Sequence, residues 1–290
     1  MKYRLMIVAA TVIWGSTFVL VKDMTSFINP AWIICLRFTA AALILAAVFA
    51  KKRALYLDRS HVLVGLLCGV ALGLAYYVQT VAITDTTPGK NAFLTSTYCV
   101  MVPFMAWIAF RRRPNRYNIV AALLAIAGVG FISLDGDLTV RWGDAMTLVC
   151  AVLYGIHITL VSKFAQGRDI CVITIWQFAM AAALTWVIAL GFEPAPNWAD
   201  IPMEIWASIG YLAVFATTIA LLFQNIGQAH LPPSSAALLL SLESVFGVLF
   251  SVAFGAETIT ARVLIGFCLV FAAIVVSEVL PERTKGAARE

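Results

Sequence analysis

Long apolar runs recur along the whole chain and constrain its fold more than any other feature. They cover roughly residues 4–22, 30–50, 61–83, 88–110, 115–134, 142–164, 171–191, 205–229, 232–254 and 261–280. A helix needs about 20 mainly apolar residues to cross a membrane, so each run is long enough for one span. Hydrophobic residues make up 62% of the chain and charged residues 12%, a composition that excludes a soluble enzyme, a disordered protein or a fibre. The sequence therefore predicts an all-α integral membrane protein with ten transmembrane helices.

The basic residues between the apolar runs indicate how the chain is oriented. With ten spans and a cytoplasmic N-terminus, the inner segments hold 15 Lys and Arg residues and the outer segments hold four, while Arg37 lies inside a span. Because cytoplasmic loops carry an excess of Lys and Arg, we predict a multi-pass protein of the cytoplasmic (inner) membrane with both termini cytoplasmic. We expect the first run to be retained, not cleaved as a signal peptide. The net charge of +5 is then a topology signal, and no nucleic acid partner is expected.

The two halves of the sequence resemble each other in series. Corresponding residues are Trp14 and Tyr154, Thr17 and His157, and Phe38 and Phe178 at an offset of 140, and Gln79 and Gln224, and Pro88 and Pro233 at an offset of 145. Each half has five spans, so the second half begins on the opposite side of the membrane. The sequence therefore predicts two inverted five-helix repeats, an organisation used by transporters that alternate access around a central site.

Three short stretches resemble the EamA-type members of the drug/metabolite transporter superfamily. They are WGSTFVLVK from Trp14, RRRP from Arg111 and LLLSLESVFGVLFS from Leu238. The resemblance implies a carrier with a central cavity between inverted bundles, which moves amino acids, other small metabolites or drugs, commonly outward. It implies a first EamA-like repeat at 1–138, a second, inverted one at 139–282 and a cytoplasmic tail at 283–290. The family usually has Pro after the Glu of the third stretch, where this chain has Ser244, so no proline kinks that span; Pro103 favours a kink in span 88–110.

Two ionisable residues inside the spans are the first candidates for a functional site. Each costs roughly 2.5–3.5 kcal/mol to insert, so a function is the default explanation. Glu243 lies at the centre of span 232–254 and could handle a proton or a cationic substrate, or it could be a neutral or paired carboxyl that fixes helix packing. Arg37 lies about 10 Å inside span 30–50. It could bind a substrate carboxylate, or it could snorkel or pair with the outer acids Asp23 or Asp85.

Uncharged polar and aromatic residues complete the candidate site. Two amides could fix polar groups of a substrate by hydrogen bonds. A threonine and a histidine occupy corresponding positions in the two halves. Three aromatic residues near mid-depth could form a wall for apolar or cationic organic solutes. These residues are Gln79, Gln224, Thr17, His157, Trp14, Tyr98 and Tyr154. Each also has a purely structural alternative: hydrogen bonds between helices for the polar groups, and packing against lipid or helices for the rings.

These features favour a secondary transporter that moves a small organic metabolite by alternating access, with efflux as the leading direction. The alternatives are an uptake carrier or facilitative uniporter of the same fold, and then a channel or a membrane-embedded enzyme. The sequence contains none of the motifs GxxxxGK[ST], HExxH or GxSxG, so we expect no enzyme activity, no cofactor and no metal. The expected partners are a small-molecule substrate and membrane lipid, with protons as a candidate coupling ion and no obligate protein partner.

Overall fold

The computed structural model is helical throughout its described residues, which are 1–111, 113–133, 140–231, 236, 239–256, 258–278 and 280. Seven helical segments in them are long and apolar enough to cross a membrane, and three shorter helices are also apolar. Several predicted features lie outside the described residues: Arg112 of the RRRP stretch, the boundary between the two predicted repeats at 138 and 139, Pro233 at the start of span 232–254, and the tail 283–290.

The helices follow the predicted apolar runs closely. In chain order they are α1 (Lys2–Met24), α2 (Pro30–Val48), the short 3₁₀ helix η1 (Ala50–Leu55), α3 (Arg59–Ile83), α4 (Pro88–Ser96), α5 (Tyr98–Phe110), α6 (Arg116–Ser133), α7 (Trp142–Phe164), α8 (Ile170–Phe192), the 3₁₀ turn η2 (Trp198–Asp200), α9 (Met203–Tyr211), the π-helix η3 (Leu212–Ile219), α10 (Ala220–His230), α12 (Leu242–Ala253) and α13 (Ala261–Glu278).

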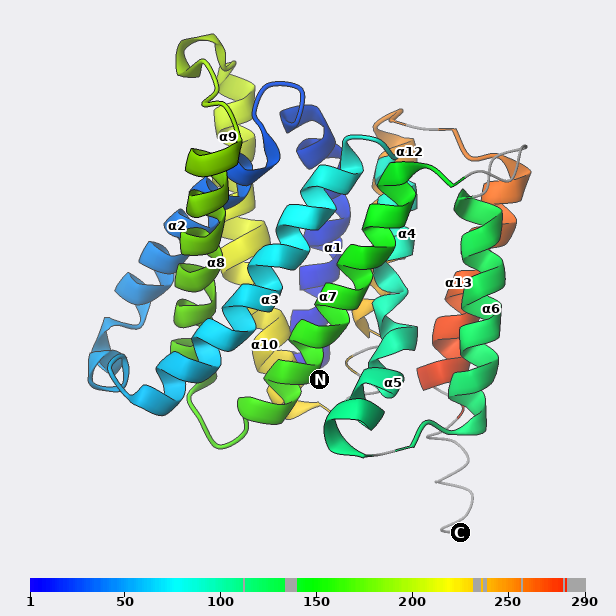
Figure 1. Cartoon of the computed structure of the whole chain (residues 1–290), viewed down its shortest axis with the longest axis horizontal. Helices are drawn as coiled ribbons and strands as arrows, with labels where there is room; N and C mark the ends of the chain where they lie inside the picture. The colour runs from blue at the N-terminus through cyan, green and yellow to red at the C-terminus, as the bar shows by residue number, and fades with distance from the viewer. Residues whose placement is uncertain are drawn as a thin grey trace.

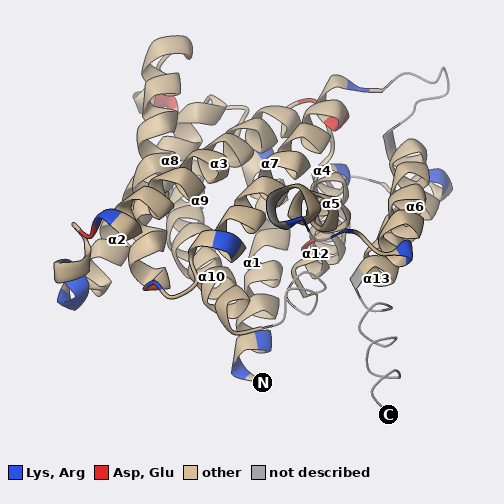
Figure 2. Ribbon diagram, turned by 60° about the horizontal axis from the view of Figure 1, so that its bottom comes forward, with Lys and Arg blue, Asp and Glu red and all other residues tan. Residues whose placement is uncertain are grey.

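The helices form one bundle with a peripheral pair at its edge (Figure 1). α3 packs against α7 and α8, α2 packs against α8, and α1 packs against α10 and α12, while α12 also contacts α4. α6 and α13 pack mainly against each other and form the pair at the edge. The N-terminus, the α2–α3 connection and the α5–α6 connection lie at one end of the bundle, and Figure 2, in which that end comes forward, shows much of the Lys and Arg there.

Glycines allow α3 and α8 to approach closely. A Cβ added at Gly69 would lie 2.6 Å from the Cβ of Met180, and one added at Gly65 would lie 2.3 Å from the Cβ of Trp176. Gly73 similarly faces the backbone of Ala181. Small residues at every fourth position are typical of tightly packed membrane helices. The stripe therefore fixes α3 against α8 and positions the residues farther along both helices.

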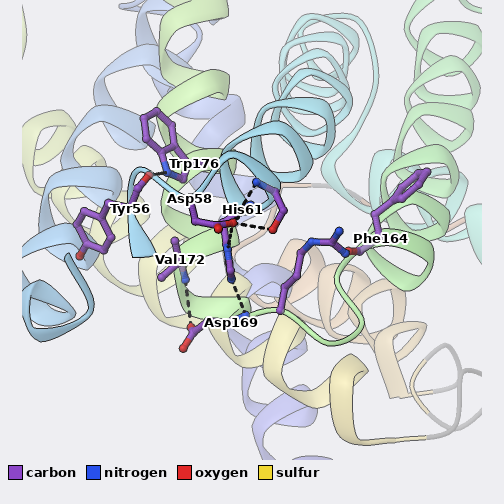
Figure 3. A network of polar contacts seen from close by, with 9 residues as sticks. Tyr56, Asp58, His61, Phe164, Asp169, Val172 and Trp176 are labelled. Carbon is purple, nitrogen blue, oxygen red and sulfur yellow. Dashed lines mark hydrogen bonds and ion pairs between the residues drawn. The ribbon is translucent and has the colours of Figure 1, made fainter. Parts of the chain in front are cut away.

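A polar network joins α3 to α8 at the end of the bundle that carries the N-terminus (Figure 3). The backbone N–H of Asp169 donates to His61 Nε2 at 3.0 Å, and His61 Nδ1 lies 2.7 Å from an oxygen of Asp58. Lys52 Nζ lies 2.6 Å from Asp169 Oδ2. Burial by itself raises the pKa of Asp169, but the Lys52 bond and the backbone N–H groups of the α8 N-terminus outweigh it, so that the pKa lies below its usual value. The indole N–H of Trp176 also donates to a backbone carbonyl of the α2–α3 connection.

Span 88–110 is interrupted at Thr97, between α4 and α5, six residues before the predicted kink at Pro103. Both the backbone N–H and the hydroxyl of Thr97 donate to the carbonyl of Leu94, at 3.2 and 2.6 Å. A side chain that bonds its own preceding turn competes with regular helix bonds. The interruption therefore coincides with a tight turn at Thr97, and Pro103 lies within α5.

A second interruption precedes α12. Residues 239 and 240 are helical, Ser241 forms a turn and α12 begins at Leu242. Both the N–H and the hydroxyl of Ser244 donate to the carbonyl of Ser241, at 3.2 and 2.7 Å. The chain thus breaks the helix beside Glu243 without the usual proline. Glu243 consequently lies in the first turn of α12 and not at the centre of a continuous span.

Candidate functional site

All nine residues predicted for the site line two adjoining cavities in the bundle. One, the His157 cavity, is lined by Trp14, Leu72, Tyr76, Thr95, Tyr98, Tyr154, His157, Ile158, Leu221, Gln224 and Glu243. The other, the Arg37 cavity, is lined by Trp14, Thr17, Phe18, Val21, Arg37, Tyr76, Gln79, Thr80, Ile83, Asn91, Tyr154 and Glu243. Trp14, Tyr76, Tyr154 and Glu243 belong to both, so these four side chains form the partition between the two cavities.

Both cavities are narrow in this conformation. The volume open to the centre of a water molecule is about 20 Å³ in the His157 cavity and about 30 Å³ in the Arg37 cavity. A single water needs roughly 10–15 Å³ by this measure. An organic solute of several heavy atoms therefore enters only if the surrounding helices move apart.

Arg37 is buried, with 2% of its surface exposed, and it faces the cavity named after it. Its Nε donates to the hydroxyl of Thr217 at 2.8 Å, and its guanidinium carbon lies 4.8 Å from the centre of the Tyr76 ring. Among the described residues, Arg37 forms no ion pair with the possible partners Asp23 and Asp85, and Asp85 accepts the backbone N–H of Gly143 at 3.0 Å. A hydroxyl and an aromatic face stabilise the cation without neutralising it.

The π-helix η3 positions two of the site residues. Its Ala216 carbonyl accepts the indole N–H of Trp14 at 2.8 Å, and its Thr217 holds Arg37. The hydroxyl of Thr218 donates to the carbonyl of Ala213, five residues earlier, at 2.7 Å. A π-helix widens the turn and is often found at functional sites. Here it directs backbone and side-chain acceptors toward α1 and α2.

Gln79 connects three helices around the cavity. Its Nε2 donates to the Thr95 hydroxyl of α4 at 3.1 Å, and its Oε1 accepts the Tyr154 hydroxyl of α7 at 2.9 Å. The Tyr154 ring meets Tyr76 edge-on at 5.5 Å and lies 6.2 Å from Tyr98. The amide therefore fixes the tyrosine wall in place.

His157 is paired with Gln177, the residue that corresponds to Arg37 in the other half of the chain. Its Nε2 lies 3.2 Å from Gln177 Oε1, and both side chains are buried. Among the described residues, neither His157 Nδ1 nor Gln177 Nε2 has a hydrogen-bond partner. Thr17, the counterpart of His157, donates to the carbonyl of Trp14 at 2.7 Å. The two halves thus place different chemistry at matching positions.

Glu243 is half-buried and lines both cavities. Within the described part of the chain, no hydrogen bond or ion pair engages its carboxylate. Tyr76, Tyr98 and Tyr154 surround the space that it faces. A carboxylate held in such a place without a cationic partner is costly unless a proton or a bound cation neutralises it.

The two cavities are built from residues that correspond in the sequence repeat. Residues of the Arg37 cavity have counterparts 140 or 145 positions away that line the His157 cavity. Five pairs follow this rule: Trp14 and Tyr154, Thr17 and His157, Phe18 and Ile158, Tyr76 and Leu221, and Gln79 and Gln224. In a sixth corresponding pair, Tyr98 lines the His157 cavity and Glu243 lines both cavities. Part of the lining of the Arg37 cavity therefore has counterparts in the His157 cavity, and both cavities are lined by residues from the two halves of the sequence.

Sequence reasoning missed the residues that hold the candidates in place. Thr217 anchors Arg37, and Thr80 and Asn91 line the same cavity. The sequence does contain a signal for Thr217: Thr217 and Thr218 are polar residues inside the apolar run 205–229. The π-helix that orients Thr217 has no recognisable sequence pattern.

Comparisons with known proteins agree with this architecture. The EamA-like transporter family matches residues 1–134 and 141–278. A protein of Archaeoglobus fulgidus named an uncharacterized transporter is 31% identical over 91% of this chain and 82% of its own length. The uncharacterized transporter YoaV of Bacillus subtilis is 24% identical over 93% of this chain and 94% of its own. One crystal structure covers 98% of this chain and 99% of its own with a TM-score of 0.72 at 19% identity, which shows a shared fold. The chain is a multi-pass membrane protein that belongs to the EamA-like transporter family.

Proposed function

We propose that this protein is a secondary transporter that exports a small amphipathic organic metabolite, such as an amino acid, a related solute or a drug, by alternating access. It crosses the cytoplasmic membrane ten times as two inverted five-helix repeats, with both termini in the cytoplasm. The substrate binds in the joined Arg37 and His157 cavities once the helices separate. Uptake by the same mechanism, or facilitative uniport, is the alternative.

One observation carries the proposal. Arg37 from α2 and Glu243 from α12 face the same cavity, and neither has an oppositely charged partner among the described residues. Trp14, Tyr76 and Tyr154 line the same cavity. An ionisable residue inside a membrane-spanning bundle is costly without a partner, so two such residues at one cavity indicate a function. A solute with charged and apolar parts matches this combination.

Three features support alternating access between inverted halves. α1 and α7, the first helices of the two halves, run in opposite directions along the bundle (Figure 1). The helix interruptions at Thr97 and Ser241 fall within one residue of corresponding places, one residue before Tyr98 and two before Glu243. Interrupted helices at the interface of two repeats are typical of secondary transporters. The third feature is the small volume of both cavities, because a substrate can enter them only after a conformational change.

The proposed orientation follows from the basic residues, which concentrate at the end that carries the N-terminus (Figure 2). Cytoplasmic loops are rich in Lys and Arg. The outward direction rests on the family resemblance, and the site does not determine it. The test below therefore measures transport both into and out of vesicles.

The test is a panel of labelled solutes in proteoliposomes, with and without a pH gradient. We expect saturable counterflow for an amphipathic solute. Glu243→Gln should reduce the rate at least tenfold or abolish its dependence on pH, because the amide cannot carry the charge or the proton. Glu204→Gln, on the exposed first turn of α9, is the matched control and should behave as wild type. A Glu243→Gln protein that keeps both rate and pH dependence would remove Glu243 from the mechanism, and unsaturable conductance would indicate a channel.

A further inference from the structure

A third hollow lies beyond the Arg37 cavity, at the end of the bundle where α1 and α3 end. This vestibule, with a volume of about 400 Å³, is lined by Val19, Lys22, Asp23, Thr84, Asp85, Thr86, Thr87, Pro88, Arg141 and Ala256. Val21 and Ile83 line the Arg37 cavity, and the residues that follow them, Lys22 and Thr84, line the vestibule. One layer of residues therefore separates the central cavity from the vestibule.

Lys22 holds that layer together. Its Nζ donates to the carbonyls of Ile83, Thr84 and Thr86 at 2.7, 2.8 and 3.2 Å. These carbonyls belong to the last turn of α3 and the connection to α4, where the helix leaves acceptors unsatisfied and presents the negative end of its dipole. All three hydrogen bonds of one ammonium thus tie the end of α1 to the end of α3.

The opposite end of the path is built differently. A cavity with a volume of about 50 Å³ is lined by Tyr98, Cys99, Val102, Ile158, Ser162, Gln228, Ala236 and Leu240. It shares Tyr98 and Ile158 with the His157 cavity, so here too the separation is one side chain thick. Ser162 is the residue 140 positions after Lys22. A short hydroxyl therefore occupies the place that corresponds to the lysine.

We propose that Lys22 is a gate residue that holds the path closed at the vestibule, so that the protein opens more readily at the Ser162 end. The proposal rests on the proposed function only in treating these cavities as one path. It assigns Lys22 a positioning role between helices and no contact with the substrate. The two ends of the path differ because Lys22 makes three hydrogen bonds at the vestibule, whereas the corresponding residue at the other end is Ser162.

Thiol accessibility tests the proposal without any substrate. A Thr80→Cys reporter lines the Arg37 cavity, and a charged, impermeant methanethiosulfonate reagent is applied only from the membrane face on which the vestibule lies. We expect Lys22→Met to speed labelling of the reporter about tenfold, which corresponds to about 1.4 kcal/mol in the opening equilibrium. Lys22→Arg keeps a cation that can donate to the carbonyls and should label as slowly as wild type.

Two controls make the result specific. Lys52→Met breaks the contact with Asp169 at the other end of the bundle and should leave the labelling rate unchanged. A Thr84→Cys reporter in the exposed vestibule should label in every variant, which shows that each variant is folded and that the reagent arrives. Labelling of Thr80→Cys at the wild-type rate in Lys22→Met, or equal acceleration by Lys52→Met, would overturn the gate. Because the readout is chemical, this failure is distinct from a failure to transport any solute.

Discussion

At the scale of single residues, the informative feature is how the structure stabilises a buried guanidinium. Arg37 is held by the hydroxyl of Thr217 and the face of Tyr76, both of which leave its positive charge in place. A carboxylate partner would have cancelled the charge and satisfied the fork of donors. The terminal nitrogens thus stay available to an anionic group in the cavity.

Arg37→Gln should therefore raise the KM for solutes with a carboxylate at least tenfold, with little change for cations that lack one. A charge-assisted hydrogen bond contributes about 1.5–3 kcal/mol, and 1.4 kcal/mol is one factor of ten. Thr217→Val is the comparison, because it removes the contact to Nε and keeps the charge, so its effect should be smaller. Counterflow rates over a range of solute concentrations measure both. Unchanged affinity for every anionic solute would end the role of Arg37 as an anion site.

At the scale of elements, the α3–α8 pair shows how closely two helices of the bundle pack. The added Cβ at Gly69 would lie 2.6 Å from Met180 Cβ and 2.7 Å from the carbonyl oxygen of Gln177, so neither neighbour can yield without moving α8. Gln177 in turn holds His157 in the cavity wall. A change at the stripe should therefore affect both stability and the site.

We predict that Gly69→Ala lowers the stability of the purified protein by about 1–3 kcal/mol, as overpacking does in well-packed interiors. The measurement is the apparent Tm in detergent. Gly210→Ala is the control, because a Cβ there meets nothing within 4 Å and alanine favours the helix. Equal Tm values for the two variants would show that α3 and α8 are not closely packed at this point.

The elements also show where sequence reasoning succeeds and where it stops. Spans follow from apolar runs because each must satisfy its backbone hydrogen bonds within the membrane. The interruption at Thr97 could not be predicted from the apolar runs, because they do not show which nearby carbonyl the Thr97 hydroxyl bonds. The π-helix η3 was equally unpredicted, since its extra residue per turn is stabilised by tertiary contacts with Trp14 and Arg37.

At the scale of the whole molecule, the site could be predicted as a set of residues but not as a set of contacts. Polar groups inside spans avoid lipid, so they gather where the helices face one another. Their partners depend on how each helix is rotated, which apolar runs alone do not specify. That is why sequence reasoning could name Asp23 and Asp85 only as possible partners of Arg37, which donates instead to Thr217.

The proposed opposite orientation of the two halves concerns the whole molecule and gives the last prediction. The connection after α2 and the connection after α8 occupy corresponding places in the two repeats, so inversion puts them on opposite faces of the membrane. Arg53 and Ala195 are exposed in these connections. We expect Arg53→Cys to react with an impermeant thiol reagent only in inverted vesicles and Ala195→Cys only in intact cells. The wild-type chain supplies the background from its own cysteines. If both positions react from one face, the halves are not inverted, and alternating access around a shared cavity loses its structural basis.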